Sequence, residues 1–463
     1  MEENSLTDIF TDIDDNIFSD GSIDPMGILR IWTSLGNKIF ESKLNTVSTD
    51  IRFYTLNLFH HTIINQCEKL YEDRILSIIG KSPYNNREDL RDGLIIFMEC
   101  LLTHAMASNL SIVNDAENYS VPGISKLKGL LLNKPNDPRV KYITIDKKEG
   151  ILVRQILLGI HGRHKGPFQQ IGIFDKNDYY ANRIIWSEAG NLFSTKEWMS
   201  LSNRLTNIIN EEILNAKFSE GNYLKVRVDK IISRDLIELY LKILTKSNFV
   251  KGRIVNFWES NLGLKKKTAG IIYNEIVNSK PNDTYEQIIK RASIKGNIED
   301  NDQLGAICAI EPFLTCITKS MNRLLVRGTS NLDEDIINFL KNWLFSNNVD
   351  LELINKYLNA KYMDEEALLR LQKLILMYNE CKVKEDGLLF AHRLINYHKS
   401  IMNDRGNLAW ISIGQNNNLT QHRSYNFSMK EINELANTNW VNNYYLPTVK
   451  SLYNGLYNLD ETI

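Results

Sequence analysis

The chain has 463 residues, of which 43% are apolar and 24% charged, and its formal net charge is −1. These values are typical of a soluble globular protein that is long enough for two to four structural units. They exclude a chain whose overall charge attracts nucleic acid or membranes, and no apolar run approaches the roughly 20 residues that span a bilayer.

The N-terminal segment 1–20 carries seven Asp and Glu and no Lys or Arg, which is the reverse of a secretory signal peptide. The five cysteines are widely spaced and form no Cys-x-x-Cys pair, so neither a disulfide framework nor a zinc ribbon is expected. Each cysteine lies in an apolar, helix-like context and is predicted to be a small buried hydrophobe. The sequence therefore predicts a cytoplasmic protein with an acidic tail.

The scarcity of proline, nine residues in all, and apolar residues that recur every three or four positions predict a mainly α-helical protein. In chain order, helices are expected at 29–40, 51–63, 235–245, 333–345, 364–378 and 386–402, and several of them begin at an aspartate that can cap the first turn. Strands are expected at 140–145 and 408–413.

Polar stretches divide the chain into the acidic tail 1–20 and three helical lobes, at 21–115, 121–280 and 303–463. The central lobe is locally basic. No repeat of 20 to 50 residues is found, so a regular solenoid is not indicated. The predicted fold class is a mainly α, multi-helix, multi-lobed assembly with at most a small β element.

The segment 159–167 combines three glycines, two histidines, Arg163 and Lys165 directly after an apolar run. We interpret it as a flexible loop whose backbone amides and cations could bind an anion, or as a plain connection between two packed helices. It is not a Walker A loop, because the Gly-x-x-x-x-Gly-Lys-Ser/Thr pattern is missing.

The histidines give no clear metal site. His161 and His164 are spaced to share a metal, but no third ligand with motif spacing lies nearby, so hydrogen-bonded histidines are favoured. His60 and His61 fall in a helical pattern and point about 100° apart, so one is expected to pack and the other to face solvent. No His-Glu-x-x-His, nucleophile-elbow or dinucleotide-binding pattern is present. We therefore predict no catalytic residue, no metal and no cofactor.

A polar group near the C-terminus contains Asp404, Arg405 and His422. Arginine forks bind phosphate or carboxylate, so the group could be an active or recognition site. It could also contain an arginine–aspartate strut that holds a long loop on a helical body, and this second interpretation is favoured.

The segment 225–267 gives the strongest indication of a partner. It contains eleven Lys and Arg against four Asp and Glu, with Phe249, Phe257 and Trp258 interleaved. Phosphate-neutralising cations and aromatics that stack on bases are typical of nucleic-acid-binding surfaces. A solvated helix face with buried aromatics, or a surface for an acidic protein, would have the same pattern. The predicted nucleic-acid contacts are Arg163, Lys165, Lys225, Arg227, Lys230, Lys251, Arg253, Lys265, Lys266 and Lys267.

One N-terminal block resembles a known group of proteins. It reads Ile-Asp-Pro-Met-Gly-Ile-Leu-Arg-Ile-Trp at 23–32, followed by Asn-Thr-Val-Ser-Thr-Asp-Ile-Arg-Phe-Tyr-Thr-Leu-Asn-Leu-Phe at 45–59. Together with 159–172, these residues resemble uncharacterised bacterial proteins that are encoded in anti-phage defence loci beside helicases and nucleases. The resemblance covers a small part of the chain, includes no catalytic signature and implies a subunit of a defence system.

From these features we expect a non-catalytic binding or scaffold subunit of a bacterial defence complex. It would contact DNA or RNA through its central basic surface, have other protein subunits as partners and not bind membranes. Two alternatives stay open. One is an atypical metal-dependent hydrolase or nuclease that uses His161 and His164 or the group around Asp404, and the other is a pure protein–protein adaptor.

Overall fold

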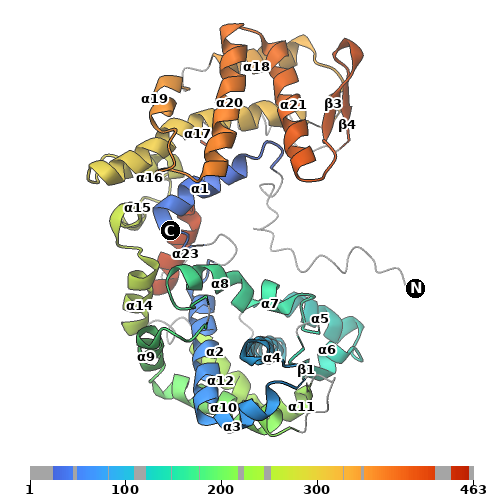
Figure 1. Ribbon diagram of the computed structural model, residues 1–463, viewed down its shortest axis with the longest axis vertical. Helices are drawn as coiled ribbons and strands as arrows, with labels where there is room; N and C mark the ends of the chain where they lie inside the picture. The colour runs from blue at the N-terminus through green and yellow to red at the C-terminus, as the bar shows by residue number, and fades with distance from the viewer. Residues whose placement is uncertain are drawn as a thin grey trace. The chain divides into compact units, whose positions relative to one another are not determined.

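The computed structural model describes residues 24–44, 49–81, 83–108, 121–146, 149–176, 178–216, 224–244, 252–326, 328–345, 349–422 and 440–457, except the side chains of 298–301. Within these ranges the protein is mainly helical, and its β structure consists of two two-stranded sheets (Figure 1). The predicted fold class is therefore confirmed. The acidic tail 1–20 lies outside the described residues.

The chain forms two compact units, each assembled from separate parts of the sequence. Among the described residues, the first unit contains Lys43–Leu262 and the part of the chain from Thr448, and the second contains the part up to Ser42 and Gly263–Pro447. The sequence predicted three lobes, and the boundary after Leu262 falls inside the central one. The basic segment 225–267 is consequently divided between the two units.

The first unit is built around α2 (Ile51–Leu70) and α4 (Arg87–Ser108), whose side chains are mostly buried. Burial on all sides is typical of helices in the centre of an assembly. The surrounding elements are α3 (Glu72–Ile78), α5 (Ile124–Asn133), α6 (Pro138–Lys141), β1 (Tyr142–Thr144), α7 (Gln155–Leu158), α8 (Ile160–Gln170), α9 (Arg183–Leu192), α10 (Lys196–Ile208), the π-helical turn Ile209–Leu214, β2 (Lys225–Arg227), α11 (Val228–Ile231), α12 (Arg234–Leu244) and α14 (Arg253–Leu262).

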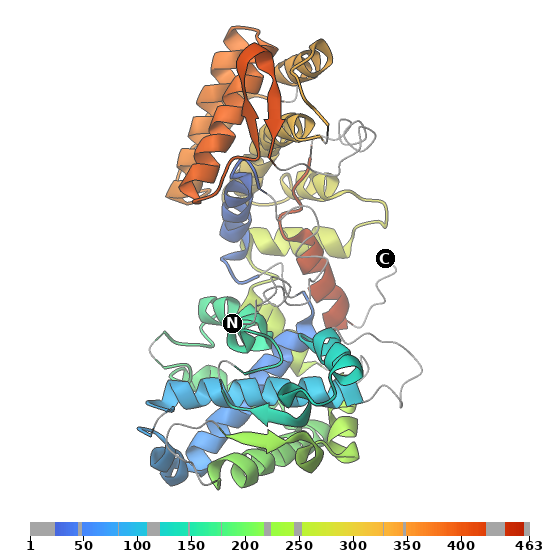
Figure 2. The same cartoon turned by 90° about the vertical axis from the view of Figure 1, so that its right-hand side faces the viewer.

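The sheet of the first unit pairs β1 with β2 in antiparallel register. Ile143 and Val226 lie opposite each other and are both buried, so the positions on either side of them point to the other face. Figure 2 shows the two strands beside α4, against which β1 packs. Gly93 permits this close approach, because a Cβ there would lie 2.8 Å from the carbonyl oxygen of Ile145, just after β1.

The second unit is helical except for one β-hairpin. Its elements are α1 (Ile28–Phe40), α15 (Lys267–Val277), α16 (Tyr285–Ala292), α17 (Ile298–Leu324), α18 (Glu334–Leu344), α19 (Leu351–Lys356), α20 (Glu365–Val383), α21 (Gly387–Asp404), β3 (Ile411–Ile413), the 3₁₀ turn Gln415–Asn417 and β4 (Leu419–Gln421); α23 (Leu446–Tyr457) starts here and continues into the first unit.

The predicted elements agree well with these bounds. The side chains of Asp333, Asp364 and Asp386 accept hydrogen bonds at the N-termini of α18, α20 and α21. Both predicted strand segments contain a strand, and both strands are only three residues long. Each pairs with a second strand that the sequence analysis did not identify.

Helix α17 is the core helix of the second unit. Among the described helices, α17 alone is long and apolar enough to cross a membrane, over the stretch Asp302–Leu324. Within the protein, 78% of the most apolar part of this stretch is buried. The apolar side chains of α17 pack against the neighbouring helices α16, α18 and α19.

The buried carboxylate of Glu311 on α17 joins three parts of the second unit. It accepts hydrogen bonds from Trp32 Nε1 on α1 at 2.7 Å and from Tyr444 Oη at 2.6 Å. The backbone amides of Val441 and Asn442 donate to it at 2.7 and 2.9 Å. Burial raises the pKa of Glu311, and these donors act in the opposite direction. The carboxylate therefore satisfies donors from segments that are far apart in the sequence.

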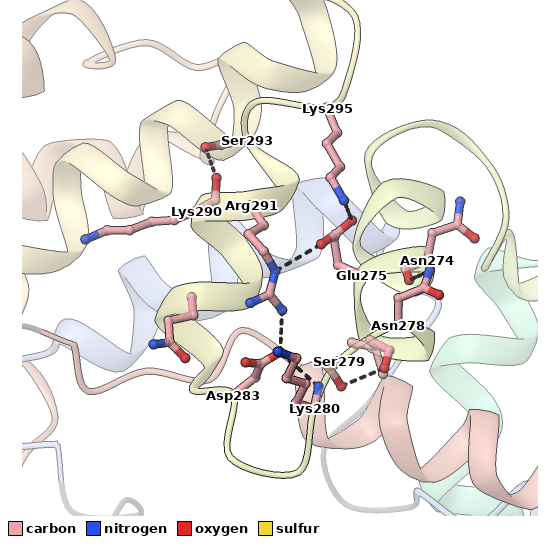
Figure 3. A network of polar contacts seen from close by, with 12 residues as sticks. Asn274, Glu275, Asn278, Ser279, Lys280, Asp283, Lys290, Arg291, Ser293 and Lys295 are labelled. Atoms are coloured by element: carbon pink, nitrogen blue, oxygen red, sulfur yellow. Dashed lines mark hydrogen bonds and ion pairs between the residues drawn. The ribbon is translucent and has the colours of Figure 1, made fainter.

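A network of ion pairs fixes the turn between α15 and α16 (Figure 3). The buried carboxylate of Glu275 pairs with Arg291 at 3.2 Å and with Lys295 at 2.5 Å. Arg291 also pairs with Asp283 at 2.7 Å, and Asp283 accepts a hydrogen bond from the backbone amide of Lys280. Because the cations of Arg291 and Lys295 both have carboxylate partners, we interpret this network as structural.

Candidate nucleic-acid interface

The ten predicted contact residues lie on several different elements. Arg163 and Lys165 are on α8; Lys225, Arg227 and Lys230 are on β2 and α11; Arg253 begins α14; Lys265, Lys266 and Lys267 lie at the start of α15 in the second unit; Lys251 lies outside the described residues. Arg253 lines a cavity of about 380 Å³ together with Thr195 and Trp198 of the α9–α10 region. Lys267 pairs with Glu41 at 3.1 Å.

The segment 159–167 is helical, so its prediction as a flexible loop was wrong. Gly159 is the N-cap of α8, and Pro167 lies inside the helix. His161, His164 and Phe168 are buried on the inner face of this helix. Their spacing of three and four residues is helical, and the glycines obscured it in the sequence.

The anion at the amino end of α8 is the protein's own Glu99, which is buried on α4. One of its carboxylate oxygens accepts a hydrogen bond from the backbone amide of His161 at 2.6 Å, and the other accepts one from Gln155 Nε2 at 2.7 Å. Burial raises the pKa of Glu99 to about 7, against the effect of these donors. A Cβ at Gly159 would lie only 1.9 Å from Glu99 Oε2, so a glycine is required there. The glycine-rich segment thus surrounds a buried carboxyl group of the protein itself.

The two cations of α8 are engaged within the first unit. Arg163 Nε donates a hydrogen bond to the carbonyl oxygen of Leu158 at 3.0 Å, and Lys165 Nζ lies 5.3 Å from the ring centre of Tyr179. The contact with Tyr179 raises the pKa of Lys165. In Figure 1, α8 and α11 lie on opposite sides of α4.

Behind α8 lies a chain of buried polar rings. His61 Nε2 is 2.9 Å from His161 Nδ1, and His61 Nδ1 is 2.9 Å from Tyr180 Oη. The guanidinium of Arg91 stacks on Tyr180 at 4.4 Å and forms an ion pair with Glu68 at 2.5 Å. These contacts link α2, α4 and α8 through hydrogen bonds, which is a structural role.

The histidines of α2 and α8 are neutral in the folded protein. His60 and His61 are both buried, so the prediction that one of them faces solvent was wrong. Burial lowers the pKa of His60 and His161 to about 3 and that of His164 to about 4. Across the part of the chain that the structure describes, no three His, Cys, Asp or Glu side chains are grouped so that they could hold one metal ion.

The C-terminal polar group contains a strut, but its aspartate is a different one. The Arg405 guanidinium donates to the carbonyl oxygen of Asp24 at 2.7 Å and to its carboxylate at 3.0 Å, and thereby fastens the end of α21 to the start of α1. His422 lies 3.2 Å from the hydroxyl of Ser412 across the β3–β4 hairpin. Asp404 ends α21 and is exposed.

The main concentration of cations in the first unit is a surface formed by α5, α6, β1, β2 and α11, which we call the basic platform. These elements contact one another around the β1–β2 sheet. Residues 124–146 and 224–231, which form it, contain eight Lys and Arg against three Asp. The eight cations are Lys126, Lys128, Lys134, Arg139, Lys141, Lys225, Arg227 and Lys230.

Some cations of the basic platform are paired with carboxylates. The ion pairs are Arg139–Asp137 at 2.8 Å, Arg227–Asp229 at 2.5 Å and Lys225–Glu149 at 2.5 Å. Lys128, Lys134 and Lys230 have no ion-pair partner among the residues that the structure describes, and Lys141 donates to the neutral amide of Asn136. The basic platform therefore presents an excess of positive charge.

Sequence reasoning identified only the β2–α11 half of this surface. It missed the five cations of 124–146, although that segment has five Lys and Arg against two Asp. The missing information was the pairing of β1 with β2, which joins segments about 80 residues apart and which no local pattern reveals.

Comparisons with known proteins provide no family. No family model matches the chain, and neither the curated proteins nor the solved structures that were compared with it give a match.

Proposed function

We propose that this protein is a non-catalytic, cytoplasmic binding subunit of a bacterial defence complex and that it contacts nucleic acid through the basic platform. The observation that supports this function best is the gathering of eight cations on α5 and its C-cap, α6, β2 and α11, which contact one another or β1 in one unit. The defence context rests on the N-terminal resemblance alone, and the other subunits of such a complex are its expected protein partners.

The energetic basis is the release of counterions. Each phosphate that a lysine or arginine neutralises releases condensed cations from the nucleic acid, which supplies affinity without sequence preference. The side chains that matter most are those that form no ion pair with a carboxylate of the described residues, which are Lys128, Lys134 and Lys230. The paired arginines of the platform are expected to contribute less, because binding a phosphate must compete with the aspartate beside each of them.

The test is the affinity for a labelled 20-nucleotide DNA, measured by fluorescence anisotropy at 100 mM salt. We expect the triple variant K128Q/K134Q/K230Q to bind on the order of a hundredfold more weakly than the unaltered protein, since three phosphate contacts are lost. The control variant K341Q/K356Q/K373Q removes three exposed lysines of the second unit and has the same net charge. It should bind like the unaltered protein.

The outcome also separates the alternatives. Equal weakening by the two triple variants would contradict the platform and indicate a response to net charge only. A complete lack of DNA and RNA binding, together with co-purification of other subunits, would favour the pure adaptor.

A further inference from the structure

The basic platform contains one aromatic side chain on its outer face. Tyr142 is the first residue of β1 and is 39% exposed, although it belongs to a strand that packs on the core of the first unit. Of the other described tyrosines of this unit, Tyr54, Tyr84 and Tyr240 are fully buried, whereas Tyr457 on α23 is 42% exposed. A single exposed ring is ordinary on a protein surface, and the feature of Tyr142 that matters is the cations around it.

The position of this ring is fixed by the sheet. Tyr142 lies directly opposite Arg227, and the next pair along the sheet, Ile143 and Val226, is buried on the inner face. Because side chains alternate between the two faces, burial of that pair holds Tyr142 and Arg227 on the outer face. A shift of β1 by one residue would turn the ring of Tyr142 toward the buried face and the side chain of Ile143 toward solvent.

Cations gather around the same end of the sheet. Helix α6 leads into β1 and ends with Lys141, whereas α11 follows β2 and carries Lys230. Since α6 and α11 contact each other, both lysines lie near the pair formed by Tyr142 and Arg227. The arrangement is a flat ring with cations on both sides.

We propose that the basic platform binds single-stranded nucleic acid, with a base stacked on Tyr142 and the flanking phosphates on Lys141, Arg227 and Lys230. This inference rests on the proposed function and deepens it. Aromatic stacking combined with a cationic track is the arrangement by which proteins bind single strands without sequence preference, because every base has a flat face.

A duplex makes poorer use of this surface. In a duplex the bases are already stacked on one another, so a ring gains a base contact only by unstacking them. Helices α6 and α11 have four residues each and strands β1 and β2 three each, so all are shorter than the helices or β-ribbons that groove readers insert. A duplex would therefore use the lysines alone and leave Tyr142 without a contact.

The test compares a 20-nucleotide single strand with a duplex of the same length for three proteins: the unaltered chain, Tyr142→Ala and Tyr142→Phe. We expect the unaltered chain to bind the single strand at least tenfold more tightly than the duplex at the same salt. Tyr142→Ala should weaken single-strand binding on the order of tenfold and leave duplex binding unchanged, and Tyr142→Phe should keep most of the affinity because it keeps the ring. Tyr285→Ala, which removes a similarly exposed ring in the second unit, is the matched control and should have no effect.

A second readout does not depend on the alanine variant folding normally. In Tyr142→Trp, the indole fluorescence should be quenched when a single strand binds and should not change with a duplex. If Tyr142→Ala and Tyr142→Phe bind both ligands like the unaltered chain while K128Q/K134Q/K230Q does not, the inference is overturned and the proposed function stands. If the unaltered chain binds neither ligand, both are overturned.

Discussion

The contact between Glu99 and Gly159 leads to a sharp prediction about the stability of the first unit. In Gly159→Ala, the new methyl group would lie 1.9 Å from Glu99 Oε2 and 2.6 Å from the carbonyl oxygen of Gln155. The backbone at Gly159 has φ −74°, which alanine adopts without strain. The substitution therefore acts through these two close contacts, which displace the buried carboxylate from the amino end of α8 and crowd the backbone carbonyl of Gln155.

The size of the effect follows from the bonds that are lost. Glu99 accepts hydrogen bonds from the amide of His161 and from Gln155 Nε2, and a hydrogen bond to a charged group contributes about 1.5–3 kcal/mol. Losing the amide bond leaves an unpaired donor at the start of α8 and a less well satisfied buried carboxylate. We expect Gly159→Ala to lower the free energy of unfolding of the first unit by about 3 kcal/mol.

The control is the same substitution on the same helix. A Cβ at Gly166 would meet nothing within 4 Å, and alanine is favoured over glycine inside a helix by about 1 kcal/mol. Urea unfolding, with hydrogen exchange of peptides from α7 and α8 to assign the transition, should show Gly159→Ala destabilised and Gly166→Ala unchanged or slightly stabilised. Equal stability of the two variants would refute the role assigned to Glu99.

Three other predictions concern pH, the core of the second unit and the thiols. Burial keeps His60, His161 and His164 neutral in the folded protein, whereas the unfolded chain protonates them near pH 6.5. The free energy of unfolding should therefore be highest above pH 6.5 and should fall by about 1.4 kcal/mol per ring for each pH unit below it. Urea midpoints that do not change between pH 6.5 and 4.5 would contradict this prediction. Glu311→Ala leaves several buried donors without an acceptor and should destabilise the second unit by about 3 kcal/mol or more in thermal unfolding, whereas a change below about 0.5 kcal/mol would show that water replaces the carboxylate. Alkylation followed by mass spectrometry should label the half-buried Cys308 before the other four thiols, which are all buried; labelling of a buried thiol first would indicate that its helix opens locally.

The sequence predicted helices reliably where their apolar faces were regular and their first turns were capped by aspartate. It failed at 159–167, because glycine and proline are typical of loops and yet this segment forms a helix whose buried face is made of His161, His164 and Phe168. Propensity was overruled there by tertiary contacts, above all by Glu99, which lies about 60 residues earlier in the chain.

The candidate interface was predicted in part. Lys225, Arg227 and Lys230 were identified from local charge density, and they lie on the basic platform. Arg163 and Lys165 were chosen for their glycine-rich context and lie on α8, which is not one of the elements that form the basic platform. Charge density along a chain does not determine which cations share a surface, because that depends on non-local contacts such as the pairing of β1 with β2.

The central claim is that unpaired lysines of the basic platform neutralise phosphates, and the salt dependence of binding tests it most directly. The logarithm of the association constant should fall linearly with the logarithm of the salt concentration. The account predicts that K128Q/K134Q/K230Q reduces the steepness of this line by about 2 to 3, since each lost contact with a single strand accounts for about 0.7 and with a duplex for about 0.9. A slope equal to that of the unaltered protein would contradict the account.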